Sequence, residues 1–333
     1  MIGLLEQGED SMERVLLRVA ATIVFLVSTA GAFAQEAKLR LVSFVPPNTA
    51  FGIPAKRWVD EVNRRGKGIL HIDMVGPEAV PVPEQANALK TGVVDLYSGP
   101  PTFYRGALIE AETLTLSDMG IAELKKNGAW DYLNRLHAEK LNAMLLTGFG
   151  DGVNFHIYTT KPANTVDKAK PFAGFVLRGP PVYKVFFESL GAQVVSTAPG
   201  EIYTALERNM VQGYGWPLWG IKDLGWIKLT RYRYDPGFYN VAVNIMINID
   251  RWKSLDKRQQ DLLKDVSAWM DVEWLKWRAE TTATEEKIQK DANIQVINLG
   301  PDLRKRANDT FWNDLAAASP QHIGHLMKLM RKQ

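Results

Sequence analysis

The sequence predicts an α/β protein of about two domains. Stretches typical of strands alternate with stretches typical of helices, which favours parallel sheets covered by helices. The length of 333 residues suits about two domains, and one long helical stretch, from Ser254 to about Lys290, suits a helix that spans two lobes. With 46% hydrophobic and 23% charged residues the composition is that of an ordinary globular protein.

The first 34 residues are typical of a secretory signal peptide. An apolar run after Arg14, interrupted only by Arg18, ends in the small-residue pattern Ala32-Phe33-Ala34, which predicts cleavage before Gln35. Met12 fits the start of this segment, because residues 1–11 are acidic. The alternative is an uncleaved membrane anchor, for which the run is short. We therefore expect the mature protein outside the cytoplasm.

Charge and cysteine content narrow the classes of partner. The chain has no cysteine, so an exported form must rely on its core and not on disulfides. The formal net charge of +3 suits anionic ligands. Neither zinc-finger spacing nor a basic run with interleaved aromatic residues occurs, so we expect no nucleic-acid partner.

The N-terminal part of the chain alternates strand and helix signals. We expect strands at 38–44, 70–75 and 93–97, with helices at 51–66 and 83–92 between them. This order predicts a parallel sheet, with Phe44 at the end of its first strand.

Three candidate ligand residues follow from this arrangement. The segment 98–105 should open into a loop at the carboxyl end of a strand, where α/β sheets bind ligands. Tyr104 could therefore offer its hydroxyl to a ligand, or it could pack beneath the loop. A helix is expected at 122–143 and a strand at 144–149. In the following strand, His156 and Tyr158 share one face, with Phe155 and Ile157 on the other. A lone histidine there is more often a hydrogen-bonded structural residue, and the alternative is contact with the ligand.

The stretch Gly174–Pro217 is the strongest candidate for an anion site. It contains a strand at 175–177, a helix after Pro180-Pro181, a short strand, a second helix and an aromatic turn. Arg178 ends the first strand, so its guanidinium should project from a strand end and could bind a carboxylate through two parallel hydrogen bonds. The alternative is a structural ion pair with an Asp or Glu.

The C-terminal part completes the two domains. Residues 221–229 predict a short element, and 238–248 predict a long buried strand that passes from one lobe to the other. The helix from Ser254 carries Trp269, Trp274 and Trp277, an aromatic stripe typical of a core. A strand at 294–297 and terminal helices follow.

Enzyme signatures do not occur. The sequence contains no G-x-S-x-G elbow, phosphate-binding loop or dinucleotide-binding motif. His322 and His325 have a spacing of three residues but no carboxylate or cysteine beside them, which is weak evidence for a metal site. The sequence therefore gives no support for catalysis.

Several motifs together resemble those of one transport family. They are Gly174-x-x-x-Arg178, Leu190-Gly-Ala192, Glu201-x-Tyr203-x-Ala205-Leu206, Val211-x-Gly213 with Pro217, Gly92-Val-Val-Asp95 and Asn248-x-x-x-Trp252-x-x-Leu255. In this order the chain resembles the solute-binding proteins of tripartite ATP-independent periplasmic (TRAP) transporters, of the dicarboxylate-binding (DctP) type. The resemblance covers essentially the whole mature chain.

The resemblance implies a two-lobed periplasmic binding protein fold with a hinge and a long helix across both lobes. Lobe I would comprise residues 35–155 and about 245–284, and lobe II residues 156–244 and about 285–333. It also implies a periplasmic protein that binds an organic acid through Arg178, delivers it to a membrane permease and catalyses nothing. Separately, we expect the protein to be a monomer. The second polar position of the family falls near His156 or Tyr158, where many members have arginine.

The turn Gln212–Pro217 departs from the family pattern. Trp216 stands where an amide commonly meets the ligand. Some keto-acid-binding relatives have tryptophan there and use a metal ion, but no metal partner can be matched here, so we expect neither a metal nor a cofactor. An indole adds a flat apolar wall. We therefore expect a monocarboxylate with a hydrophobic or aromatic body, for example a keto or hydroxy acid.

The candidate ligand-binding residues are Arg178, Trp216, His156, Tyr158, Tyr104, Trp219, Phe44 and Phe238. For Trp216 and Trp219 the alternative is packing inside their own lobe. Two other functions remain open, a secreted enzyme acting on an organic acid and a ligand-sensing binding protein.

Overall fold

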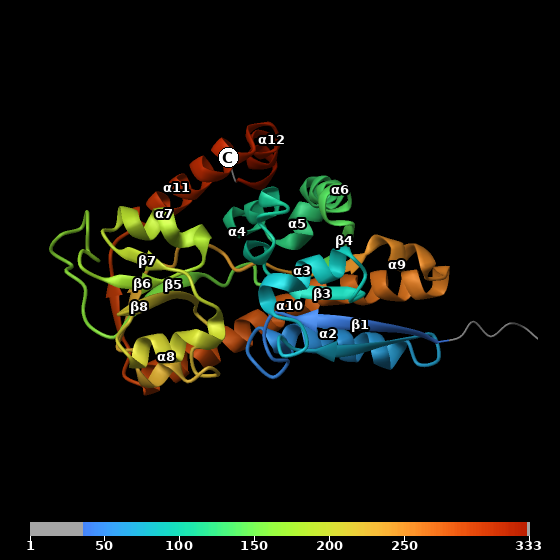
Figure 1. Ribbon diagram of the computed structural model, residues 1–333, viewed down its shortest axis with the longest axis horizontal. Coiled ribbons are helices and arrows are strands. Elements are labelled where there is room, and N and C mark those ends of the chain that lie inside the picture. The colour runs from blue at the N-terminus through green and yellow to red at the C-terminus, as the bar shows by residue number, and fades with distance from the viewer. Residues whose placement is uncertain (1–35, 332–333) are drawn as a thin grey trace, which may run out of the picture. The chain divides into compact units, whose positions relative to one another are not determined.

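A computed structural model describes residues 36–331 and contains two mixed sheets (Figure 1). The predicted signal peptide lies outside the described residues. In the order of their hydrogen bonding, the strands of the five-stranded sheet are β2 (Leu70–Val75), β1 (Ala37–Ser43), β3 (Leu96–Gly99), β10 (Val243–Asn248) and β4 (Ala143–Phe149). Those of the six-stranded sheet are β11 (Gln295–Asn298), β9 (Tyr232–Asp235), β5 (Phe155–Thr159), β8 (Gly213–Pro217), β6 (Val176–Arg178) and β7 (Gln193–Val195). We call the parts built on these sheets lobe I and lobe II.

Helices of very different length accompany the two sheets. The α-helices are α2 (Gly52–Arg65), α3 (Val82–Lys90), α4 (Thr113–Leu116), α5 (Ile121–Lys126), α6 (Ala129–Leu141), α7 (Pro181–Ser189), α8 (Ile202–Glu207), α9 (Ile249–Ser254), α10 (Lys257–Asp291), α11 (Asp302–Ala318) and α12 (Pro320–Met330). Short 3-10 helices are η1 (Pro101–Phe103), η2 (Ile109–Glu112), η3 (Pro199–Glu201) and η4 (Trp226–Lys228). Within residues 36–331, no helix combines the length and apolarity that a membrane span requires.

The expectation of a parallel sheet is only partly correct. In lobe I, β1 runs parallel to β2 and β3, but β10 runs antiparallel to β3 and β4. In lobe II, β5 is antiparallel to both β8 and β9. The physical reason is the connectivity: β10 and β5 each enter their sheet directly from a strand of the other sheet. Neither therefore has the helical crossover that returns a chain to a parallel strand.

Two predicted elements are shorter than expected. The strand expected at 238–248 begins only at Val243, because residues 236–242 connect β9 to β10. This connection lies beside the reverse crossing from β4 to β5, with Val241 N–H donating to Val153 O at 2.8 Å. The helix expected at 122–143 is interrupted at Gly128, whose φ of 86° lies in the left-handed region.

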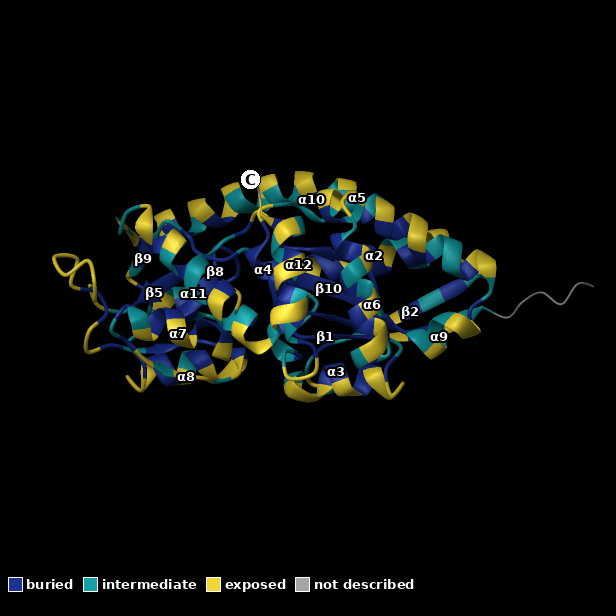
Figure 2. Ribbon diagram, turned by 90° about the horizontal axis from the view of Figure 1, so that it is seen from above, coloured by how far each residue is buried: buried dark blue, intermediate teal, exposed yellow. Residues whose placement is uncertain are grey.

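The long helix α10 contacts both lobes, as expected. It begins after Asp256, whose side chain accepts a hydrogen bond from Gln259 N–H in a capping box. Its first half packs on α2 and β4 of lobe I, whereas Gln289, near its end, donates to Leu218 O of lobe II at 2.6 Å (Figure 2). Trp274 is buried against Phe149, so this part of the aromatic stripe belongs to the core.

Candidate functional site

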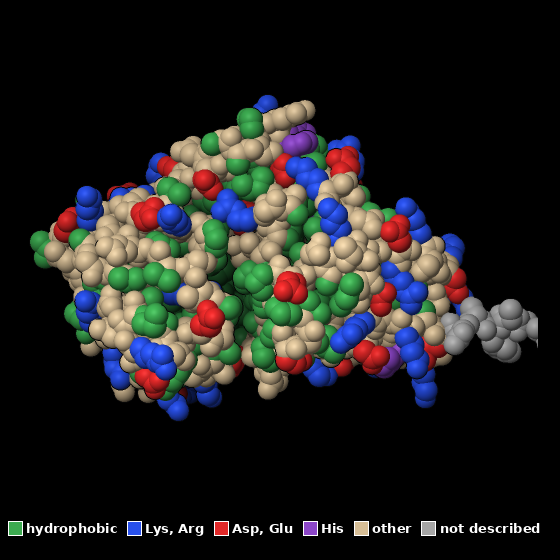
Figure 3. All heavy atoms as spheres, in the orientation of Figure 1, with side chains coloured by type: hydrophobic (Ala, Val, Ile, Leu, Met, Phe, Trp, Pro, Cys, Tyr) green, Lys and Arg blue, Asp and Glu red, His purple; other side chains and the backbone are tan. Residues whose placement is uncertain are grey.

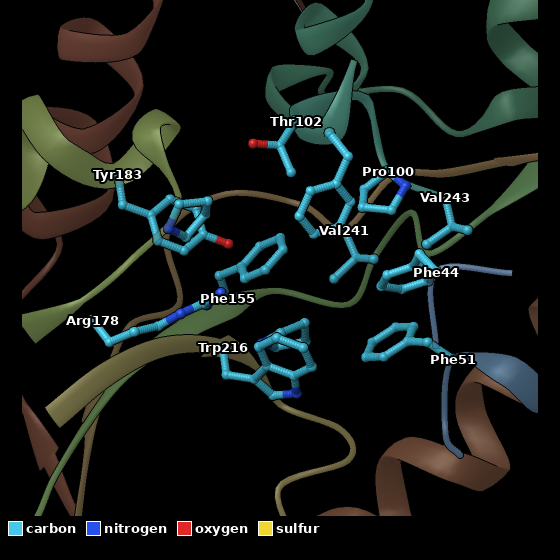
Figure 4. A pocket seen from close by; sticks show the side chains of 13 residues that line it. Phe44, Phe51, Pro100, Thr102, Phe155, Arg178, Tyr183, Trp216, Val241 and Val243 are labelled. Carbon is cyan, nitrogen blue, oxygen red and sulfur yellow. The ribbon is translucent and has the colours of Figure 1, made fainter. Parts of the chain in front are cut away.

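A largely apolar pocket lies where the strand ends of both lobes meet. It encloses about 490 Å³ of empty space, part of which opens to solvent, and the hollow is visible between hydrophobic side chains in Figure 3. It adjoins the carboxyl ends of β1, β3, β6 and β8, the edge at which α/β sheets bind ligands. The lining residues are Phe44, Phe51, Pro100, Thr102, Phe103, Phe155, Arg178, Pro180, Tyr183, Trp216, Pro217, Val241 and Val243 (Figure 4).

Arg178 is the one Lys or Arg among these lining residues. It ends β6, and only 3% of its surface is exposed. Its Nε donates to the carbonyl oxygen of Thr197 at 3.0 Å, and its Nη2 donates to the same oxygen. Within residues 36–331, no carboxylate forms an ion pair with it. Burial lowers its pKa to about 10, so the guanidinium still carries its charge at neutral pH.

Aromatic rings from both lobes form much of the remaining wall. Trp216 directs its indole Nε1–H away from any ligand, because that group donates to Trp219 O at 3.0 Å. Phe44 and Phe103 face each other in lobe I with ring centroids 6.0 Å apart. Phe155 contacts Tyr183 edge to face at 5.3 Å. The pocket therefore offers apolar ring surface around a single cation.

Thr102 adds a polar group from lobe I. Its hydroxyl is buried and makes no hydrogen bond of normal geometry in the described part of the chain. Behind it lies Glu112, 1% exposed, with Arg105 Nε 3.7 Å from its carboxylate. Burial raises the pKa of Glu112 to about 7, while Arg105 and the neighbouring Thr102 hydroxyl oppose that rise.

Three of the eight candidate residues, Arg178, Trp216 and Phe44, line this pocket. The stretch Gln212–Pro217 was expected to be a turn, but residues 213–217 form the strand β8. The reason is pairing: β8 lies between β5 and β6 in the centre of the lobe II sheet. Trp216 thus reaches the pocket from a strand end.

His156 and Tyr158 lie on β5 outside the pocket lining. His156 Nδ1 is 2.9 Å from the Asp235 carboxylate, so this histidine sits in a buried polar cluster. Tyr158 donates its hydroxyl to Pro217 O at 3.3 Å and stacks on Tyr214. Both side chains are committed to contacts inside lobe II.

The other three candidates also lie behind the wall. Tyr104 accepts a hydrogen bond from Asn244 Nδ2 at 2.6 Å and is 3% exposed, as in the packing alternative. Trp219 stacks on Phe51 and donates its Nε1–H to Thr282. Phe238 lies in an aromatic cluster against Tyr183. Whether any of these five residues affects binding stays a prediction.

Sequence reasoning missed several lining residues for identifiable reasons. Phe155 occupies the face of β5 opposite to His156, so alternation separated the two faces without showing which one borders the pocket. Thr102 belongs to the predicted ligand loop 98–105, in which Tyr104 is the predicted ligand residue. Tyr183 lies on α7, where its apolar neighbours make it resemble a core residue.

The lining does not fit a resident metal ion. Calcium prefers several oxygen ligands that include carboxylates, whereas the thirteen lining residues include no Asp or Glu and do include the cation Arg178. Elsewhere in residues 36–331, no group of three or more His, Asp or Glu side chains could hold a metal ion. The expectation of metal-free binding stays a prediction.

Comparison with known proteins finds one protein family and several solved structures that match this chain. Residues 119–319 match the family model "Bacterial extracellular solute-binding protein, family 7". The monocarboxylate 2-oxoacid-binding periplasmic protein of Nostoc sp. is 23% identical over 219 residues, which span 63% of this chain and 58% of that relative's length.

Solved structures share the fold at low sequence identity. A TRAP periplasmic solute-binding protein from Desulfovibrio salexigens, with bound orotic acid, has a TM-score of 0.78 and 16% identity over 89% of this chain and 97% of its own. A TRAP transporter solute-binding protein from Bordetella bronchiseptica, with calcium and picolinate in its active site, has a TM-score of 0.76 and 19% identity over 89% and 92%. Both have the two-lobed fold described above.

Proposed function

The chain belongs to family 7 of the bacterial extracellular solute-binding proteins, and from this premise we propose that it is the periplasmic receptor of a TRAP transporter. In this role it binds a small organic monocarboxylate between its lobes. It then delivers the ligand to a membrane permease and returns it chemically unchanged. We further propose that it acts as a monomer.

The observation that carries this proposal is the uncompensated charge of Arg178. A buried cation is costly unless an anion or several hydrogen bonds replace its hydration. Arg178 has one carbonyl partner, Thr197 O, and its Nη1 makes no hydrogen bond within residues 36–331. A ligand carboxylate would supply both the missing charge and the missing acceptors.

The apolar wall supports a ligand with a single carboxylate. A second carboxylate would meet aromatic and aliphatic side chains without another Lys or Arg in the lining, and its desolvation would then be uncompensated. Two of the similar proteins fit this class, because the Nostoc protein is named for monocarboxylate 2-oxoacids and the Bordetella structure holds picolinate. We therefore favour keto, hydroxy or aromatic monocarboxylic acids.

Calorimetric titration of the purified protein tests the proposal. The panel comprises pyruvate, 2-oxoisovalerate, benzoate, picolinate, malonate, succinate and glucuronate. We expect the tightest binding among the first four. Binding confined to the sugar acid would overturn the ligand class, and the absence of any carboxylate binding would overturn the receptor function.

Two measurements separate the receptor from the remaining alternatives. Mass spectrometry after prolonged incubation should recover the bound acid intact, whereas turnover would identify an enzyme. Reconstitution with its permease in vesicles should give ligand uptake that depends on this protein. Binding without such uptake would favour a sensor.

A further inference from the structure

We propose that the Tyr183 hydroxyl donates a second hydrogen bond to the ligand carboxylate, beside the guanidinium of Arg178. This inference rests on the proposed function and adds a second group to the anion site. A second hydrogen bond would also hold the carboxylate in one orientation inside an otherwise apolar pocket.

The Tyr183 ring is held firmly against the strands that carry the site. The third residue of α7, it is 3% exposed. A Cβ built at Gly215 on β8 would lie 2.8 Å from this ring, and one at Gly179 would lie 3.2 Å from it. The two glycines thus leave the space that the ring fills. Phe155 and Phe238 contact it edge to face at 5.3 and 5.4 Å.

The hydroxyl of Tyr183 makes no hydrogen bond to another residue within residues 36–331, and it is not among the fully buried unpaired polar atoms, so it is open to the pocket that the residue lines. Most other buried tyrosines have a protein partner for this group: Tyr104 with Asn244, Tyr158 with Pro217, Tyr214 with Thr230, Tyr234 with Ala163 and Tyr239 with Ala307. Tyr97 also lacks one, but it does not line the pocket. Because the Tyr183 hydroxyl borders the pocket and has no partner inside the protein, it is free to donate to a ligand bound there.

Tyr183 and Arg178 are placed to act on one anion. Both side chains enter the pocket from the lobe II side, with the phenol and the guanidinium converging in Figure 4. They lie close enough to influence each other's ionisation. Burial raises the pKa of Tyr183 well above its usual value, so the phenol stays protonated and can donate at any physiological pH.

The roles of Arg178 and Tyr183 follow from the number of hydrogen bonds that a carboxylate can accept. A carboxylate has about four acceptor positions. The guanidinium of Arg178 can fill two of them, and a phenol can fill a third without adding charge. A neutral donor also costs less to keep buried in the ligand-free protein than a second cation would. The pair therefore recognises a carboxylate with a single positive charge.

The isosteric substitution Tyr183→Phe tests the inference, because it removes the hydroxyl and keeps the ring. With benzoate, picolinate and 2-oxoisovalerate as probes, we expect calorimetry to give dissociation constants about 10- to 50-fold higher than for the wild type. Tyr239→Phe is the matched control. Its ring belongs to the same aromatic cluster, but its hydroxyl donates to Ala307 O at 3.1 Å, so its affinity should stay unchanged.

The outcomes separate this inference from the proposed function. If the wild type binds these acids and Tyr183→Phe binds them equally well, the inference is wrong and the receptor function stands. If the wild type binds none of the carboxylates in the wider panel, the receptor function itself fails. A crystal structure of the wild-type complex gives a test that needs no variant. We expect Tyr183 Oη within about 3 Å of a carboxylate oxygen, and a separation too long for a hydrogen bond would contradict the inference.

Discussion

Two buried arginines on the lobe II sheet have opposite surroundings. Arg233 on β9 donates to both carboxylate oxygens of Asp235, at 3.0 and 3.1 Å, and to Gln289 at 3.0 Å. Arg178 on β6 is buried more deeply but donates only to Thr197 O. The first charge is neutralised inside the fold and the second is not. Burial of an arginine alone therefore does not indicate a ligand site, whereas the missing counter-ion supports the proposal that Arg178 binds the ligand.

Replacing each of these two arginines in turn by methionine should give the largest difference between the two sites. Arg178→Met should weaken binding of the tightest monocarboxylate by about 100-fold or more and leave folding stability unchanged or higher, because an unpaired buried charge is removed. Arg233→Met should leave affinity nearly unchanged. It should lower the free energy of unfolding by about 2–4 kcal/mol, because Asp235 loses its bidentate partner.

Calorimetry and urea denaturation measure these two effects. Equal losses of affinity in both variants would remove the distinction between a ligand arginine and a structural one.

Acid titration should affect the Arg233 site and not the Arg178 site. Although partial burial opposes it, hydrogen bonds from His156 and Arg233 lower the pKa of Asp235 to about 2. Because the pKa is lower in the folded state than in the unfolded chain, this carboxylate contributes stability above about pH 4. The contribution is lost as the pH falls towards 2.

We expect Asp235→Asn to remove about 1–2 kcal/mol of stability at pH 7 and to flatten the decline of stability below pH 4. Denaturation curves from pH 2 to 7 measure both. If the stability of the variant falls below pH 4 as steeply as that of the wild type, Asp235 is not responsible for this decline.

The smallest expected effect concerns the wall beside Arg178. Trp216→Phe keeps an aromatic face but loses ring area and the bond to Trp219 O. We expect aromatic acids such as benzoate to bind about threefold more weakly and pyruvate to change less, since pyruvate covers less apolar surface. Titration of both acids tests this. A larger loss for pyruvate than for benzoate would exclude the indole as a wall for the ligand body.

Local sequence signals predicted the charged residue of the pocket, Arg178, better than they predicted the apolar residues that line it. Arg178 could be predicted because a strand that runs into Gly179-Pro180-Pro181 must end there, which leaves the guanidinium at the sheet edge. The choice of His156 over Phe155 was not decidable in the same way. It depends on which face of β5 borders the pocket, and that follows from long-range antiparallel pairing with β8 and β9.

Tyr183 shows a second limit of local signals. Its spacing with Phe186 and Phe187 on α7 is that of a core face, and the ring does pack there. Only the three-dimensional arrangement shows that its hydroxyl emerges beside Arg178, while most other buried tyrosines use theirs in hydrogen bonds inside the protein. The function of such a residue depends on one atom that no periodicity describes.

The close approach of Gly215 to the Tyr183 ring bears on how the proposed ligand preference could change by mutation. A single added methyl group at Gly215 would meet Tyr183 and Phe187 at 2.8 Å and displace the phenol. Gly215 does not line the pocket, so the ligand would touch no altered side chain. Selection or laboratory evolution could thus change which acid binds by a substitution at Gly215, a residue behind the pocket wall. Inspection of the ligand contacts alone would overlook this residue.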